Sequence, residues 1–200
     1  ARFPTTPEKL AGLLPGREKQ YIVIGAHHDH LGAGEDGEIR RGADDNASGI
    51  SLLIELARAL QDSCFRYGIV FAAFGAEEKG MIGSFHFLEN FVPGTGNILL
   101  MINLDMLGRP RDRTLLFEEL NVPPGTASLM PAPSEGYPEL KKGPGGLSDH
   151  VPFFQAGIHS LYFTTGFHED AHTSRDLPGK TDPEGMQEIL DWLVIFVSRL

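Results

Sequence analysis

Residues 21–30 read YIVIGAHHDH, an apolar run that passes directly into three histidines and an aspartate. The first half is apolar and rich in β-branched residues, and it predicts a buried strand over residues 21–25 that is bounded by Gly25. The polar half therefore follows the point where the strand ends. Because ligands bind outside the carboxyl ends of the strands in open α/β sheets, we expect a binding site at this edge.

Further strands and helices alternate along the chain. Apolar runs predict strands over residues 67–74, 97–104, 114–117 and 159–164. Helical spacing of apolar residues predicts helices over residues 50–61, capped by Asn46 or Ser48, and 81–91, and a last helix with Asp182 as its N-cap. The alternation indicates an α/β sandwich on a largely parallel sheet, in a single domain that covers residues 1–200.

Residues 121–146 differ from the rest of the chain. Six of these 26 positions are proline and five are glycine, and the segment has no visible period. Two interpretations are open, because long loops without regular structure are usually either functional or disordered. The segment is part of a substrate-binding rim or it is a mobile surface loop.

The overall composition excludes several classes of protein. The net charge is −10, which argues against nucleic acid as a partner because phosphate binding requires a basic surface. No apolar stretch approaches the 18 residues of a membrane span. The single cysteine, Cys64, excludes an intrachain disulfide and a thiolate zinc cluster.

Four other blocks offer carboxylates or histidine, namely GADDNASG (42–49), GAEEKG (75–80), NLDM (103–106) and AHTSRD (171–176). Asp44 and Asp45 repel each other, and a cation is the simplest reason to place them together. One aspartate can bridge two zinc ions through its two oxygens. Acidity that complements a helix N-terminus is an alternative explanation for Asp45.

The remaining polar residues suit a hydrolytic zinc centre. His27 and Asp29 would project to the same side of an extended chain, where Asp29 could orient the His27 ring. Of the adjacent Glu77 and Glu78, one can bind metal while the other accepts a proton from water. Asp105 follows an apolar run, where a buried charge needs a partner such as a metal ion.

Together, GAHHDHLG, GADDNASG, FGAEEKGMIGS, MINLDMLGR, SDHVPF and HTSRD resemble the co-catalytic di-zinc aminopeptidase family, which is related to glutamate carboxypeptidases and glutaminyl cyclases. The resemblance covers residues 20–110 and 147–199. It implies the zinc-exopeptidase fold, a three-layer α/β/α sandwich on a mixed, largely parallel central sheet (phosphorylase/hydrolase-like). It also implies export from the cell, a habit of bacterial members, whereas the oligomeric state is left open.

The resemblance also implies a complete site with two Zn²⁺ ions. His27 and Asp105 would hold one zinc, and Glu78 and His172 the other. Asp44 would bridge the two ions. Glu77 would be the general base and Asp29 would orient His27. The other histidines, with His28 and His30 nearest the pocket, are expected to be loop or packing residues.

The implied reaction is the removal of N-terminal residues from peptides. A hydroxide that bridges the two ions would attack the peptide carbonyl, the ions would anchor the free α-amino group of the substrate, and Glu77 would pass a proton to the leaving amine.

One departure from the family concerns the residue before His172. Members commonly have a tyrosine there whose hydroxyl stabilises the oxyanion, and this chain has Ala171. Either another donor replaces it, with His150 as a candidate, or activity is reduced. The resemblance leaves two alternative functions. The first is a glutaminyl cyclase-like single-zinc acyltransferase, and the second is a non-catalytic binding module that retains the fold, to which Ala171 gives weight.

Overall fold

The computed structural model describes residues 10–35, 37–91, 93–122, 129–132 and 138–200. Within these residues one sheet has seven strands in the order β1-β5-β2-β6-β9-β7-β8. Its strands are β1 (Leu10–Leu14), β2 (Tyr21–His27), β5 (Gly68–Phe74), β6 (Ile98–Leu104), β7 (Thr114–Leu120), β8 (Glu139–Lys142) and β9 (His159–Thr164). The central strands β5, β2, β6 and β9 run parallel, whereas β1 and β7 run antiparallel to their neighbours β5 and β9.

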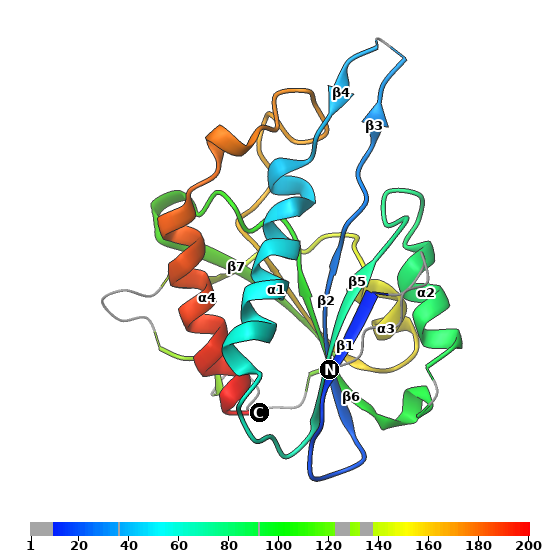
Figure 1. Cartoon of the computed structure of the whole chain (residues 1–200). Coiled ribbons are helices and arrows are strands. Elements are labelled where there is room, and N and C mark those ends of the chain that lie inside the picture. The colour runs from blue at the N-terminus through cyan, green and yellow to red at the C-terminus, as the bar shows by residue number, and fades with distance from the viewer. Residues whose placement is uncertain (1–9, 36, 92, 123–128, 133–137) are drawn as a thin grey trace.

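Helices cover both faces of this sheet (Figure 1). Helices α1 (Gly49–Leu60) and α4 (Pro183–Ser198) pack together on one face, and α2 (Ile82–Glu89) and α3 (His150–Gln155) on the other. Asp182 caps α4 by accepting a hydrogen bond from the Gly185 amide. The layers confirm the predicted α/β/α sandwich on a mixed, largely parallel sheet. Among the described residues, no helix has both the length and the apolar character needed to cross a membrane.

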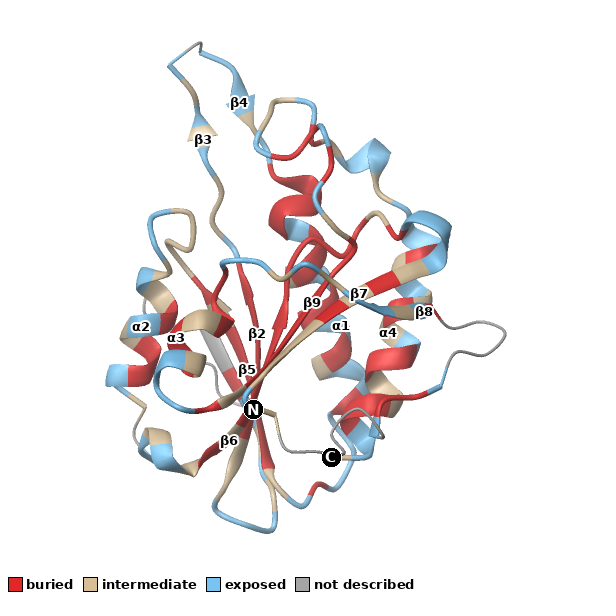
Figure 2. Cartoon of the chain, turned by 180° about the vertical axis from the view of Figure 1, so that it is seen from behind, coloured by how far each residue is buried: buried red, intermediate tan, exposed pale blue. Residues whose placement is uncertain are grey.

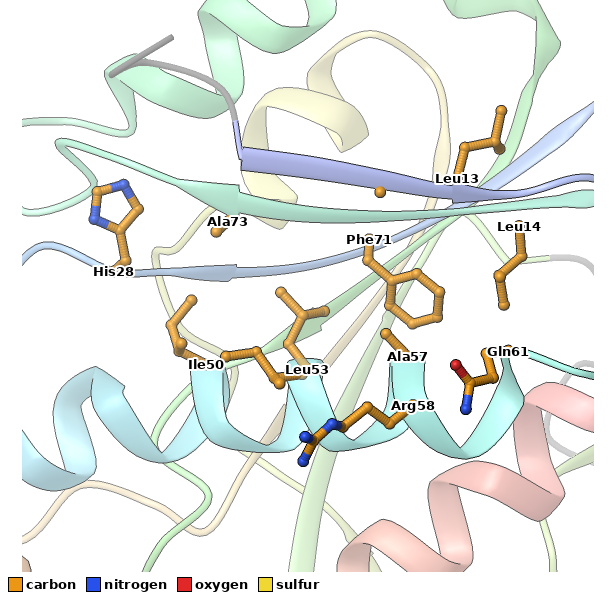
Figure 3. Close-up of a pocket in the computed structure, with 12 residues that line it drawn as sticks. Leu13, Leu14, His28, Ile50, Leu53, Ala57, Arg58, Gln61, Phe71 and Ala73 are labelled. Atoms are coloured by element: carbon orange, nitrogen blue, oxygen red, sulfur yellow. The ribbon is translucent and has the colours of Figure 1, made fainter. Parts of the chain in front are cut away.

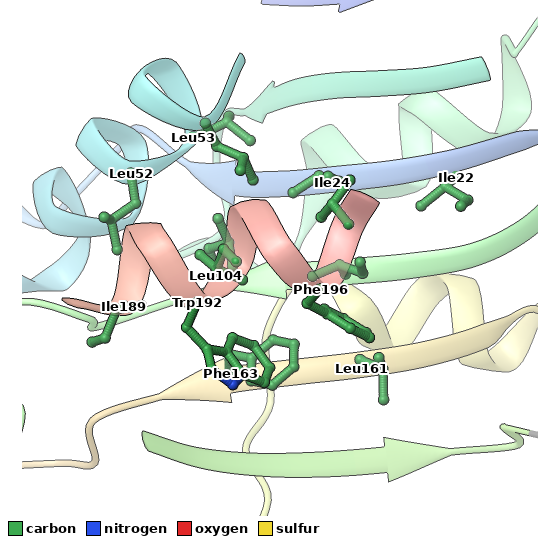
Figure 4. Close-up of a cluster of buried hydrophobic side chains, with 14 of the residues drawn as sticks. Ile22, Ile24, Leu52, Leu53, Leu104, Leu161, Phe163, Ile189, Trp192 and Phe196 are labelled. Atoms are coloured by element: carbon green, nitrogen blue, oxygen red, sulfur yellow. The ribbon is translucent and has the colours of Figure 1, made fainter. Parts of the chain in front are cut away.

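The larger hydrophobic core lies between the sheet and the α1–α4 layer (Figure 4). Phe163 of β9 packs edge to face on Trp192 of α4 at 5.4 Å between ring centroids, and Trp192 stacks on Phe196. The central strands β2, β5, β6 and β9 are almost continuously buried (Figure 2). Because helices pack on both faces of these strands, the strands are held rigidly in the sheet. The polar blocks at the strand ends therefore have fixed positions.

The structure adds elements that the sequence did not predict. Strand β1 forms the edge of the sheet, and β3 (Gly32–Ala33) and β4 (Ile39–Arg40) make a hairpin that projects above it. Strand β8 lies inside residues 121–146, so this segment is not a loop throughout. Residues 123–128 and 133–137 of the predicted loop lie outside the described residues.

Candidate metal centre

The polar blocks meet at the carboxyl ends of the parallel strands. His27 is the last residue of β2, and Asp105 directly follows β6. Glu77 and Glu78 lie in the turn between β5 and α2. Because β2 lies between β5 and β6 in the sheet, these three strand ends are adjacent.

A first donor group consists of His27, Asp45 and Asp105, all three buried. The His27 Nε2 atom lies 3.3 Å from Asp45 Oδ1 and 3.3 Å from Asp105 Oδ1. Burial lowers the pKa of His27, but contacts with the carboxylates of Asp105 and Asp45 outweigh it and raise the pKa to about 12. The group thus concentrates negative charge around one imidazole.

A second donor group consists of His30, Asp45 and Glu78. His172 faces the same two carboxylates, with its Nε2 atom 2.9 Å from Asp45 Oδ2 and 3.7 Å from Glu78 Oε2. Asp45 therefore presents Oδ1 to the first group and Oδ2 to the second. Burial raises the pKa of Glu78, but the imidazoles of His30 and His172 outweigh it and lower the pKa.

This arrangement corrects the expectation that Asp44 bridges the two ions. The Asp44 carboxylate points to other partners and accepts hydrogen bonds from the Gly108 amide at 2.6 Å and the Ser48 hydroxyl at 3.1 Å. Its Oδ2 atom lies 3.0 Å from Nε2 of the buried His168. With its oxygens occupied in this way, Asp44 supports the turn, and its neighbour Asp45 has the position between the groups.

Asp176 fixes the backbone of the turn that contains Asp45. Its buried carboxylate accepts hydrogen bonds from the amides of Asp44 and Asp45 and from Nη2 of Arg109. The block AHTSRD thus contributes more than His172. It also supplies the carboxylate that holds the turn with Asp44 and Asp45 in place.

Asp29 lies next to His27 as expected, but its carboxylate has a different main contact. The His27 Nδ1 atom is 3.1 Å from the backbone carbonyl of Asp29 and 3.8 Å from its carboxylate. The carboxylate accepts hydrogen bonds from the amides of Glu77 at 3.0 Å and Glu78 at 3.3 Å. Asp29 therefore contacts the His27 ring through its backbone carbonyl and the glutamate turn through its side chain.

Glu77 lines the same pocket as every member of the two donor groups except His30. Burial raises its pKa to about 8; the charge of His27 opposes this shift, whereas those of Asp105 and Asp149 add to it. A carboxylate with a raised pKa binds a proton more readily than an exposed one. This property suits a group that accepts a proton from water.

The pocket has a volume of about 500 Å³ and an apolar wall beside the donor groups. Its exposed rim includes Leu147 and Phe167, which are 82 % and 71 % exposed. Tyr162 also lines it, whereas His150 is fully buried behind Tyr162, with their rings stacked at 4.7 Å. The structure thus gives His150 no place on the pocket wall as a substitute for the tyrosine missing at Ala171.

A second cavity of similar volume lies between α1 and the sheet edge at β1 and β5 (Figure 3). Its lining is almost entirely apolar, with Leu13, Ile50, Leu53 and Phe71 among its residues. None of its lining residues is acidic, and His28 is its one histidine. It therefore offers no donor set comparable to the first pocket.

The sequence interpretation missed His30, Asp45 and Asp176 as parts of the site. His30 was expected to be a loop or packing residue near the pocket, because a single histidine has no spacing that marks it as a ligand. It follows the end of β2 at His27, and the structure places its ring beside Asp45 and Glu78. The adjacency of Asp44 and Asp45 gave no means of choosing between them.

Comparisons with known proteins identify relatives of the chain. The model of the family described as Peptidase family M28 matches residues 9–197. The chain is 33 % identical over 169 residues to the aminopeptidase YwaD of Bacillus subtilis (strain 168). The matched region covers 82 % of the chain and 35 % of that protein. The chain therefore spans about a third of the length of this relative.

Solved structures show the same fold. The zinc aminopeptidase BSAP from Bacillus subtilis matches with a TM-score of 0.80 and 28 % identity, over 94 % of the chain and 49 % of that structure. A glutaminyl cyclase from Porphyromonas gingivalis matches with a TM-score of 0.77 over 94 % of the chain and 76 % of that structure. At 20 % identity, the second likeness bears on the fold alone.

Proposed function

Because the chain belongs to peptidase family M28, we propose that it is the catalytic part of a zinc-dependent aminopeptidase that uses two Zn²⁺ ions. One observation carries the proposal. A single buried carboxylate, that of Asp45, has one oxygen in each of two donor groups, and Glu77 lines the pocket beside them. The names of the relatives, zinc aminopeptidase among them, support the choice of metal and reaction.

The residues present fit a pair of zinc ions. Imidazole nitrogens and carboxylate oxygens are the donors that zinc takes outside thiolate sites. The Glu78 Oε1 atom and both ring nitrogens of His30 are buried without a hydrogen-bond partner. Buried polar atoms normally have a partner, and a cation would provide one here. His27 and Asp105 would hold one ion, His172 and Glu78 the other, with Asp45 shared.

The residues around the ions have separate tasks. Zinc held there would lower the pKa of a water molecule and polarise a carbonyl oxygen. Glu77 accepts the proton of that water and donates it to the leaving amine. Asp29 keeps Glu77 in place by accepting a hydrogen bond from its amide at 3.0 Å.

We propose as substrate a peptide with a free N-terminus whose first side chain is apolar. The pocket volume lies in the range of roughly 300–1,000 Å³ typical of small-ligand sites, which suits the end of a peptide. Met106, Leu116 and Phe167 give it an apolar wall next to the donor groups. An apolar side chain would bury surface against this wall.

The decisive experiment compares wild type with Glu77→Gln on amino-acyl anilides and on N-blocked peptides. The amide cannot accept the proton, so we expect the zinc content to be kept and the turnover to fall by about 10²- to 10⁴-fold. Glu55→Gln is a matched control, because Glu55 lies exposed on α1 and pairs with Arg58. Equal cleavage of blocked peptides would refute the aminopeptidase proposal, and a metal-free wild type would refute the zinc site.

Two further measurements on the wild type, ammonia release and peptide binding, distinguish the alternatives. A glutaminyl cyclase-like activity would release ammonia from peptides with N-terminal glutamine without cleaving a peptide bond. A non-catalytic module would bind peptide and turn over none. The presence of both donor groups together with Glu77 favours hydrolysis over either alternative.

A further inference from the structure

His30 lies in the metal centre, but the proposed function gives it no task. Its side chain is 8 % exposed, and its Nδ1 atom lies 2.8 Å from Glu78 Oε1 and 3.8 Å from Asp45 Oδ2. One carboxylate oxygen from each of these residues lies within 4.8 Å of the other and of a His30 ring nitrogen. The ring is therefore directed at the donors of the second ion.

The contact between His30 and Glu78 lacks the alignment of a hydrogen bond. Although Nδ1 and Oε1 are 2.8 Å apart, neither atom has a hydrogen-bond partner by geometry, and both are buried. Two metal-ligand atoms that bind the same ion lie close together, but each is directed at the ion and not at the other, so they do not form a hydrogen bond. A metal ion would satisfy both at once.

The fold keeps the His30 ring in this position. A Cβ at Gly42 would lie 2.6 Å from Cγ of His30, so the ring packs directly on the backbone of residue 42. Gly42 also has a φ of 63°, which other residues rarely adopt. The first glycine of GADDNASG therefore makes room for an imidazole beside Asp45.

We propose that His30 is a ligand of the second zinc ion through Nδ1, an inference that rests on the proposed function. The second ion would then have four protein donors, His30, His172, Asp45 and Glu78, whereas the first would have three, His27, Asp45 and Asp105. Zinc sites with four protein ligands are usually structural, and sites with three keep a position open for water or substrate. We would therefore expect tighter binding of the second ion than of the first.

The test measures metal binding in wild type, His30→Ala and a matched control, His28→Ala. His28 belongs to the same motif, but its side chain is exposed and lines the apolar cavity instead (Figure 3). Each protein is equilibrated with buffers of graded free Zn²⁺, and Co²⁺ absorption reports the ligand number. We expect His30→Ala to lower the affinity for the second ion by more than 100-fold. Loss of a residue that only orients a ligand typically lowers metal affinity by roughly 10- to 100-fold. His28→Ala should match wild type.

A second variant, His30→Asn, separates ligation from orientation. Asparagine can donate a hydrogen bond to Glu78 but is a poor zinc ligand, so we expect His30→Asn to lose the second ion as His30→Ala does. Retention of the second ion by His30→Asn, or by His30→Ala, would overturn the proposal.

X-ray absorption of the zinc-loaded wild type tests the same point without a substitution. Imidazoles from His27, His30 and His172 shared by two ions would support the proposal, and two imidazoles would overturn it. A wild type that binds no zinc would instead refute the proposed function, so the two failures are distinguishable.

Discussion

At the scale of single residues, Asp45 is the residue whose carboxylate contacts both donor groups. Its Oδ1 atom faces His27 at 3.3 Å and its Oδ2 atom faces His172 at 2.9 Å. Asp45→Asn keeps the shape but replaces one charged oxygen with an amide that cannot bind a cation. We therefore expect zinc affinity at both sites to fall by about 100-fold or more, measured as metal content against free zinc.

Asp44→Asn is the matched control for Asp45→Asn. Asp44 is as buried as Asp45, but its partners are Gly108, Ser48 and His168. We expect two ions to be retained and the free energy of unfolding to fall by about 1–3 kcal/mol, because charge-assisted hydrogen bonds are weakened. Loss of zinc from Asp44→Asn but not from Asp45→Asn would return the bridging role to Asp44.

For Asp44 and Asp45, the sequence could predict a cation site but could not predict which of the two residues contacts the ion. The DD pair predicted a cation at this turn, and the structure places a donor group there. Which of two adjacent side chains faces the metal depends on the backbone of the turn, where Asp45 and Asn46 have non-helical dihedral angles. Spacing alone contains no information on that backbone.

At the scale of elements, the turn between β5 and α2 sets the position of both glutamates. The Gly83 amide donates to the Gly75 carbonyl at 2.9 Å, and a Cβ at Gly83 would lie 2.3 Å from that oxygen. The first turn of α2 therefore touches Gly75, the first residue of the block GAEEKG. This close approach is possible only for glycine.

Gly83→Ala should displace α2 and, with it, Glu77 and Glu78. We expect a loss of about 1–3 kcal/mol in the free energy of unfolding and a fall of roughly 10- to 100-fold in kcat/KM, since small displacements of catalytic groups are costly. Urea unfolding and anilide hydrolysis measure the two effects. Gly96→Ala is the control, because a Cβ there meets no atom within 4 Å. If both variants behaved as wild type, the contact at Gly75 would not position the glutamates.

The four central strands that the sequence predicted are the buried ones, and the partly buried β7 was predicted over only part of its length. Strands β2, β5, β6 and β9 are rich in apolar residues, and the structure places each within a few residues of its predicted range. Strands β1 and β8 were missed because LAGLL and ELKK have little intrinsic strand preference, and pairing with β5 and β7 makes them strands. Lysines on an edge strand such as β8 also discourage pairing with other chains.

At the scale of the whole molecule, stability depends on two adjacent titratable residues in α3 and its N-cap. Burial raises the pKa of Asp149 to about 7, with Ser84 opposing the shift. Burial also lowers the pKa of His150 to about 4, against the opposing charge of Asp105. In the unfolded chain these groups titrate near their ordinary values of about 3.9 for aspartate and 6.5 for histidine.

The two groups change stability in opposite directions between about pH 4 and 6.5. There the unfolded chain binds a proton at His150 that the folded protein does not, so this residue makes stability rise with pH. The folded protein keeps a proton on Asp149 that the unfolded chain releases, so that residue makes stability fall with pH. Each slope reaches about 1.4 kcal/mol per pH unit, and in wild type the two contributions offset each other.

Substituting either Asp149 or His150 should therefore leave the pH dependence of stability that the other residue contributes. We expect the free energy of unfolding of Asp149→Asn to increase with pH across this window relative to wild type, and that of His150→Asn to decrease. The measurement is urea unfolding at several pH values in chelator-treated protein, so that metal binding does not contribute. Because each variant is compared with wild type at every pH, titration of other groups cancels. Parallel profiles for all three proteins would show that neither residue keeps its shifted protonation state in the folded protein.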